Sequence, residues 1–182
     1  MTTSSTGTLG DGVYYEREAY AGLLRRFAIL LVDLATLFAI GLFLGVLWFG
    51  VFAEFGDPGS GFLWSWIGLG YVYLVFLEAS PIGTLGFFLA GVKIVNLKGE
   101  RPSFLRMTLR LLMWFLGPFN PLIDLIWLGG DDDRQTLRDK FAGTYVVKKG
   151  ALPAGHGPVG VAYYNLLGFT IAFPEVKKHV RA

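Results

Sequence analysis

Two long apolar stretches stand out in the pattern of hydrophobic and polar positions along the chain. Residues 23–52 contain few charges, and residues 62–79 contain only one, Glu78. A membrane-spanning helix needs roughly 20 apolar residues at a rise of about 1.5 Å each. Both stretches therefore predict transmembrane helices. The segment between them, 53–61, has the Gly, Pro and Asp content of a turn.

A third apolar stretch, residues 104–128, is interrupted by Gly and Pro at 117–121. Proline breaks a continuous helix, so this region is either one kinked span or a hairpin of two short helices. Of the 16 Lys and Arg residues, half lie at or after position 134, and the 53–61 loop has none. The positive-inside rule favours the hairpin, with the N-terminus and the C-terminus both on the cytoplasmic side of the plasma membrane.

Between the apolar stretches, residues 92–96 alternate as a short strand does, and residues 144–147 form a second β-type run. The pattern therefore predicts an all-α polytopic membrane protein with a small cytoplasmic β element. Residues 1–20 form a polar tail, 21–150 the transmembrane domain, and 151–182 a Gly/Pro linker with a short interfacial segment. No internal repeat is evident.

Composition narrows the class of protein. The 182 residues are 53% hydrophobic and 16% charged, with a mean hydropathy of +0.52, whereas soluble domains have about a quarter charged residues. This deficit of charge excludes disorder and argues against a water-soluble globule, and the lipid bilayer is the expected partner. The net charge of +2 implies no nucleic acid. The absence of cysteine removes disulfides and thiolate chemistry.

An intramembrane carboxylate, Asp33, is the sharpest chemical signal. Arg26 lies seven positions earlier, which is about two helical turns, so both side chains share one helix face. A carboxylate in hydrocarbon costs several kcal/mol and needs a partner. We expect Arg26, and also Glu78 at the end of the second span, to provide it. This group is either a proton or ion site or a buried structural bridge.

The sequence shows no clear motif for a metal site, a phosphate-binding loop or a catalytic site. His156 and His179 have no Cys or carboxylate at metal-ligand spacing and read as surface residues. The glycines of 86–91 lack the Lys-Ser/Thr of a phosphate-binding loop, and the acidic run 131–133 is typical of a solvated loop or helix cap. No nucleophile and base pair lies within a span, so we expect no enzyme activity, no cofactor and no metal.

Three segments together form a recognisable pattern: 22–33, 84–95 and 134–147. They resemble the RDD family of small bacterial and archaeal membrane proteins, named for one arginine and two aspartates. Arg26 and Asp33 match the arginine and the first aspartate, and Asp139 looks like the second. Arg138 stands where members often have His. The resemblance covers roughly residues 20–150 and implies a membrane protein for which transport is commonly proposed.

Two functional hypotheses follow. In the first, the chain is a transporter or a transporter subunit, and Asp33 binds a proton, cation or small solute between helices. In the second, it is a non-transporting scaffold or accessory subunit whose basic cytoplasmic face binds a partner or anionic lipid. So small a chain would need a homo-oligomer or another membrane subunit to enclose a pathway.

Overall fold

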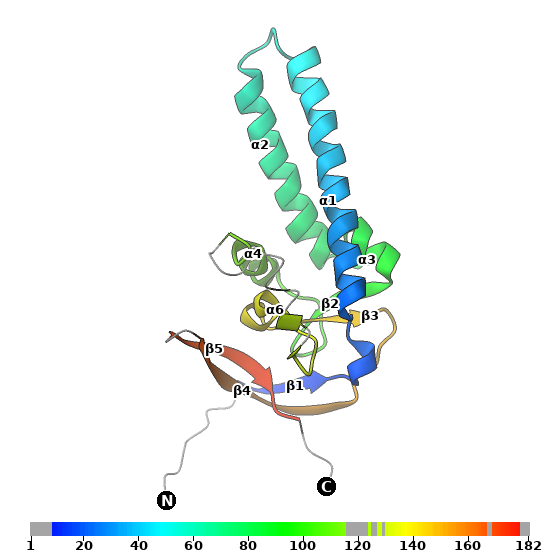
Figure 1. Ribbon diagram of the computed structural model, residues 1–182, viewed down its shortest axis with the longest axis vertical. Coiled ribbons are helices and arrows are strands. Elements are labelled where there is room, and N and C mark those ends of the chain that lie inside the picture. The colour runs from blue at the N-terminus through cyan, green and yellow to red at the C-terminus, as the bar shows by residue number, and fades with distance from the viewer. Residues whose placement is uncertain (1–8, 116–123, 125–126, 129, 167–168, 179–182) are drawn as a thin grey trace, which may run out of the picture.

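The computed structural model describes residues 9–115, 124, 127–128, 130–166 and 169–178. A long helical hairpin rises from a foot of short helices and a two-stranded ribbon, and a second, three-stranded sheet lies beyond the foot (Figure 1). The first and last strands both belong to that sheet, at the end of the molecule opposite the hairpin loop.

The hairpin consists of α1 (Leu23–Gly45) and α2 (Pro58–Tyr71), which continue as the π-helical segments η2 (Val46–Val51) and η3 (Val72–Leu77). Asp57 caps α2 by accepting hydrogen bonds from two backbone N–H groups of its first turn. The continuous helices of 29 and 20 residues are long and apolar enough to cross a membrane, as the pattern predicts. Only 17% and 11% of the residues in their most apolar 18-residue segments are buried, and such exposed apolar surface is consistent with embedding in a lipid bilayer.

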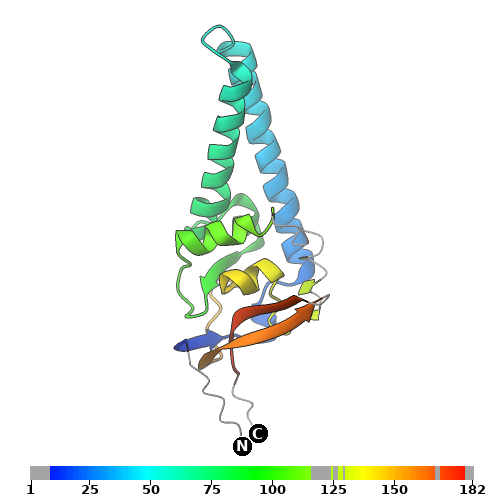
Figure 2. The same ribbon diagram turned by 90° about the vertical axis from the view of Figure 1, so that its left-hand side faces the viewer.

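The foot includes the short helices α3 (Leu85–Ala90), α4 (Phe104–Leu112) and α6 (Leu137–Ala142). Helix α4 runs crosswise to the hairpin (Figure 2). Its nine residues are too few to span a bilayer. The break at 117–121, on which the choice between a kinked span and a helical hairpin depends, lies outside the described residues.

The structure is not all-α, so this part of the fold prediction is wrong. The predicted ribbon is confirmed: β2 (Val92–Asn96) pairs antiparallel with β3 (Thr144–Lys148). The ends of the chain form a second sheet, in which β4 (Gly155–Leu166) pairs with both β1 (Asp11–Tyr14) and β5 (Phe169–Val176). One turn of 3₁₀-helix, η1 at Arg17–Ala19, joins this sheet to the hairpin.

The sequence pattern did not predict the second sheet, because its glycines are typical of a flexible linker. A Cβ on Gly157 would lie 2.0 Å from the carbonyl oxygen of Lys177, and one on Gly12 would lie 2.5 Å from Cγ2 of Val176. These glycines therefore allow close approach of neighbouring strands rather than flexibility. The described residues of the apolar segment 161–173, which was expected at the membrane interface, belong to β4 and β5.

The β2–β3 ribbon is buried on both faces. Val95 and Tyr145 belong to an apolar cluster shared with the three-stranded sheet. Ile94 and Val146 belong to a second cluster, shared with the helices. Because successive side chains of a strand point to opposite faces, one ribbon joins the membrane helices to the sheet.

The ribbon also reveals an internal repeat, contrary to the expectation from sequence. Each strand follows a six-residue helix that begins after a threonine, Thr84 or Thr136, and ends at a left-handed glycine, Gly91 or Gly143. Both segments read Thr-Leu-x4-Ala-Gly, 52 positions apart. The strands pair around equivalent residues, with Ile94 opposite Val146 in the register. The two segments are therefore related by a local two-fold axis.

The two helix-ending glycines should respond differently to alanine. Gly91 has φ +63° and open space around it, so Gly91→Ala should cost about 1 kcal/mol for the left-handed backbone. Gly143 has φ +60°, and its Cβ would lie 2.8 Å from Nη1 of Arg106. That atom donates to the carbonyls of Ala142 and Gly143 at 3.2 Å. Gly143→Ala should therefore cost about 2 kcal/mol.

Thermal unfolding of the full chain in detergent, followed by circular dichroism, measures both losses. Equal losses in the two variants would contradict a role for Arg106 at the end of α6.

Candidate functional site

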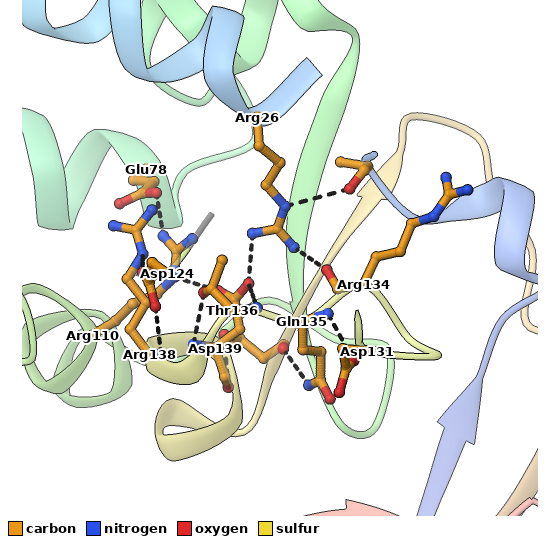
Figure 3. A network of polar contacts seen from close by, with 12 residues as sticks. Arg26, Glu78, Arg110, Asp124, Asp131, Arg134, Gln135, Thr136, Arg138 and Asp139 are labelled. Carbon is orange, nitrogen blue, oxygen red and sulfur yellow. Dashed lines mark hydrogen bonds and ion pairs between the residues drawn. The ribbon is translucent and has the colours of Figure 1, made fainter. Parts of the chain in front are cut away.

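Arg26 lies in the first turn of α1, and only 6% of it is exposed. Its Nη1 lies 2.5 Å from Oδ2 of Asp139 in α6, and its Nη2 donates to the carbonyl oxygen of Arg134 at 2.8 Å. Its Nε donates to the carbonyl of Ala21 at 3.5 Å. The arginine thus ties the start of the first membrane helix to the α6 segment (Figure 3).

Asp139 has no exposed surface and contacts a second arginine. Nε of Arg110, in α4, donates to its Oδ1 at 2.7 Å, and Nη1 of Arg110 pairs with Glu78 at the end of the second span. Asp139 Oδ2 also accepts the backbone N–H of Thr136, whose hydroxyl accepts the N–H of Asp139, which forms a capping box. Positive and negative groups therefore alternate through Arg26, Asp139, Arg110 and Glu78.

The electrostatics of Asp139 follow from this arrangement. Burial alone would raise its pKa, but the charges of Arg26, Arg110 and Arg138 outweigh burial and hold the pKa well below the ordinary value. The side chain of Arg138 is only 18% exposed, and its desolvation, together with the nearby charge of Arg110, lowers its pKa to about 10. Asp139 is accordingly a permanent negative charge among arginines.

Asp33 lies apart from this network, with partners of a different kind. Its Oδ1 accepts the Tyr73 hydroxyl at 2.7 Å and the backbone N–H of Gly86 at 2.9 Å, and its Oδ2 accepts the Thr84 hydroxyl at 2.9 Å. The expected pairing with Arg26 and Glu78 is therefore corrected. Arg26 lies in the first turn, where it meets α6, whereas Asp33 lies two turns further along, beside the start of α3.

The approach of α3 to Asp33 requires glycine. A Cβ on Gly86 would lie 2.7 Å from the carbonyl oxygen of Ile29 and 2.8 Å from Oδ1 of Asp33. Any larger residue would separate α3 from α1 and remove the N–H donor from the carboxylate. Of the two glycines at 86 and 91, Gly86 thus serves close packing, whereas Gly91 ends the helix in a left-handed conformation.

Asp124 occupies the equivalent place in the second repeat. Its Oδ1 accepts the backbone N–H of Arg138 at 3.4 Å, just as Asp33 accepts that of Gly86, 52 positions earlier. Asp124 Oδ2 also lies 2.8 Å from Nε of Arg138. The symmetry is therefore broken at one position: the second residue of the helix is glycine beside Asp33 and arginine beside Asp124.

A cavity of about 50 Å³ lies between these groups at the foot of the hairpin. Its lining combines apolar side chains of the helices with polar ones that include Asp33, Glu78, Asp124, Arg110 and Arg138. By volume it can hold roughly three water molecules, and its polar lining supplies partners for them. Arg110 and Trp114 also line it, and among the described residues the buried Nη2 of Arg110 and Nε1 of Trp114 have no hydrogen-bond partner.

The acidic run 131–133 has structural partners. Oδ2 of Asp131 lies 2.5 Å from Nζ of the buried Lys140, and Oδ1 of Asp133 lies 2.5 Å from Nζ of Lys178. Asp131 also accepts backbone N–H groups of its own loop. Within the described residues, no group of three or more His, Asp or Glu side chains could hold a metal ion.

Arg26, Asp33, Glu78 and Asp139 were the site residues predicted from the sequence, and all four lie at the foot of the hairpin. Four further residues contact them or line the same cavity and were not predicted: Tyr73, Thr84, Arg110 and Asp124. The spacing of Arg106 and Arg110 on one face of an otherwise apolar α4 was a usable signal for Arg110. Tyr73 and Thr84 carried none, because hydroxyls beside a membrane helix are common.

Removing the charge of Asp139 should destabilise the protein strongly. Asp139→Asn leaves Arg26 and Arg110 buried without their shared anion, which should cost about 3 kcal/mol or more in unfolding free energy. The matched control is Asp132→Asn, because the Asp132 side chain is 92% exposed and its contact with Arg17 is 3.7 Å long. Thermal unfolding in detergent compares them. Similar losses in both variants would refute the central role of Asp139.

The same group predicts an acid dependence of stability. The folded pKa of Asp139 is lower than its unfolded pKa, near 4, so the unfolded chain binds the proton more readily. The contribution of Asp139 is therefore complete above about pH 4 and decreases as the pH falls further. Melting temperatures between pH 7 and 3 should fall more steeply for the wild type than for Asp139→Asn. Parallel curves would contradict the assignment.

A comparison with family models identifies the family of this chain. The model of the RDD family matches residues 20–143, which contain the hairpin, the three short helices and the whole charged network. No curated protein and no solved structure matches the chain. Because the family match covers more than half of the sequence, the resemblance seen in the motifs is confirmed, and the chain belongs to the RDD family of membrane-associated proteins.

Proposed function

We propose that this protein is a multi-pass plasma-membrane protein that moves a proton or a small cation past Asp33. The observation that carries the proposal is the cavity at the foot of the hairpin, which brings this carboxylate together with Glu78 and Asp124. Ionisable groups inside membrane proteins mark ion or proton pathways when they face a polar cavity.

The partners of Asp33 favour exchange of a bound ion. Its three donors, Tyr73, Thr84 and Gly86, are neutral, and within the described residues no cation pairs with it. Protonation or cation binding there breaks no ion pair. Asp124, by contrast, is paired with Arg138. Gly86 stands where the second repeat has Arg138, so among the described residues Asp33 lacks the paired cation that Asp124 has. Asp33 is therefore the exchangeable carboxylate of the two.

The distribution of charge supports an orientation with both termini cytoplasmic. Among the described residues, every Lys and Arg lies at the end of the molecule away from the hairpin loop, Arg25 and Arg26 in the first turn of α1 included, and the hairpin loop 53–61 has none. The positive-inside rule then places the foot and its cavity on the cytoplasmic side. The upper parts of α1 and α2 are largely exposed, so a second copy or another membrane subunit would complete the pathway.

A second candidate is a membrane scaffold without transport. The pairing of Arg26, Asp139, Arg110 and Glu78 favours it, because such a network ties both membrane helices to the foot. In this function Asp33 would likewise only anchor α3 to α1.

Proton flux distinguishes the candidates. Wild-type protein in liposomes that contain a pH-sensitive dye should acidify the interior under an imposed potential, and Asp33→Asn should reduce the rate at least about tenfold, since the exchangeable charge is lost. Asp57→Asn is the matched control, because Asp57 is an exposed helix cap in the hairpin loop. Sodium and potassium gradients test the cation alternative. Wild-type rates equal to those of empty liposomes for all three ions would favour the scaffold.

Thiol labelling provides an independent check, because the chain has no cysteine of its own. Leu37→Cys lines the cavity and should react with a small membrane-impermeant reagent. Phe43→Cys, at a position that is 64% exposed toward the expected lipid, should not. Absence of labelling at Leu37→Cys would mean that water does not reach the cavity.

A further inference from the structure

An open groove of about 920 Å³ runs along the foot of α1, on a different side from the cavity. Four cations line it and only one carboxylate, Glu18. The cations come from separate parts of the chain: Arg17, Arg25, Arg134 and Lys148. The fold therefore gathers a strongly basic surface that no single segment of the sequence displays.

These cations are available to a ligand. Within the part of the chain that the structure describes, the side chains of Arg25, Arg134 and Lys148 form no ion pair or hydrogen bond. Arg17 makes only an exposed contact with Asp132 at 3.7 Å, which contributes little. Figure 3 shows the guanidinium of Arg134 extending away from the buried network, although its carbonyl faces Arg26.

The backbone of Arg134 is consistent with a role for its side chain. Its φ is +47°. Among the described residues, no other residue except glycine has a positive φ. Such a conformation costs about 1 kcal/mol or more and favours glycine or asparagine. An arginine at this position places a charge over Gly22, where α1 begins, with Nη1 only 3.2 Å from the place of a Cβ.

Exposed apolar side chains border the cations. Leu23, Leu24 and Leu89 line the same groove and are 46%, 83% and 65% exposed. Leu23 is also the first residue of the first candidate membrane span, so a bilayer that this helix crosses would have its headgroups at the level of the groove. A soluble anion would need no leucines, whereas a ligand with a phosphate and acyl chains satisfies both parts of the surface.

We propose that this groove binds the phosphate headgroup of an anionic phospholipid, with the acyl chains against the leucines. Arg25, Arg134 and Lys148 contact the headgroup, and the start of α1, where Gly22 provides no side-chain cap, adds backbone N–H groups of favourable polarity. The site does not depend on transport at Asp33, because none of these residues belongs to the cavity.

Native mass spectrometry of the full chain in detergent tests the proposal. The probes are phosphatidylglycerol and phosphatidylcholine with identical acyl chains. Wild type should retain the anionic lipid in preference to the zwitterionic one. Arg25→Gln combined with Arg134→Gln should weaken phosphatidylglycerol binding about 30-fold, from the usual contribution of two cations near an anionic lipid. The control pair, Lys98→Gln with Arg101→Gln, removes the same charge from exposed positions outside the groove and should retain it.

Several results would overturn the proposal. If the wild type retains both lipids equally, this result alone overturns the proposal. Equal loss in the two charge pairs would mean that binding is a general effect of net charge. Displacement of the lipid by millimolar inorganic phosphate would assign the groove to a free anion. If the double variant does not fold, Lys148→Gln, at an exposed strand end, should still weaken binding about fivefold, and unchanged binding would refute the site.

Discussion

A single fully buried carboxylate, Asp139, determines how the foot of this molecule is assembled. A negative charge without solvent is costly unless cations surround it, and here they come from two other helices, as Arg26 of α1 and Arg110 of α4. Arg110 in turn holds Glu78 at the end of the second span. The attraction that keeps Asp139 ionised is thus also the attraction that fixes both membrane helices to α6.

The local two-fold axis explains why two similar carboxylates have different partners. Asp33 and Asp124 both accept the N–H of the second residue of a short helix, at positions 86 and 138. The side chain at that position decides the rest. Gly86 allows α3 to touch α1 and leaves Asp33 with neutral donors, whereas Arg138 forms an ion pair with Asp124. One copy of the repeat therefore holds its carboxylate with neutral donors, and the other holds it with a cation.

The first turn of α1 serves the cavity and the groove at once. Successive residues of a helix point about 100° apart, so Arg26 is buried against Asp139 while its neighbour Arg25 is exposed toward the groove. The internal charge network and a surface suited to anionic lipid are therefore adjacent but use different side chains. The β2–β3 ribbon below them, buried on both faces, joins these membrane-facing sites to the three-stranded sheet.

Local periodicity determined what the sequence could establish by itself: two membrane-length helices, the strands at 92–96 and 144–147, and the membrane class. The family motifs likewise singled out Arg26, Asp33 and Asp139. The helices and strands are predicted by the pattern of neighbouring residues within each segment. The family motifs are recognised from the residues themselves, without knowledge of what they contact. The two-fold repeat was also present in the sequence, as Thr-Leu-x4-Ala-Gly, but was too short to be recognised without the pairing of Ile94 and Val146.

Only the tertiary structure decided which charges meet. Arg26 and Asp33 share a helix face, and spacing alone made them a pair, yet Arg26 contacts a residue 113 positions away. The reason is that a buried charge is stabilised by whichever opposite charge the packing of helices brings within about 3 Å, and that choice depends on the whole fold. The second sheet was hidden for a similar reason, because glycines that allow strands to approach closely have the same local signature as a linker.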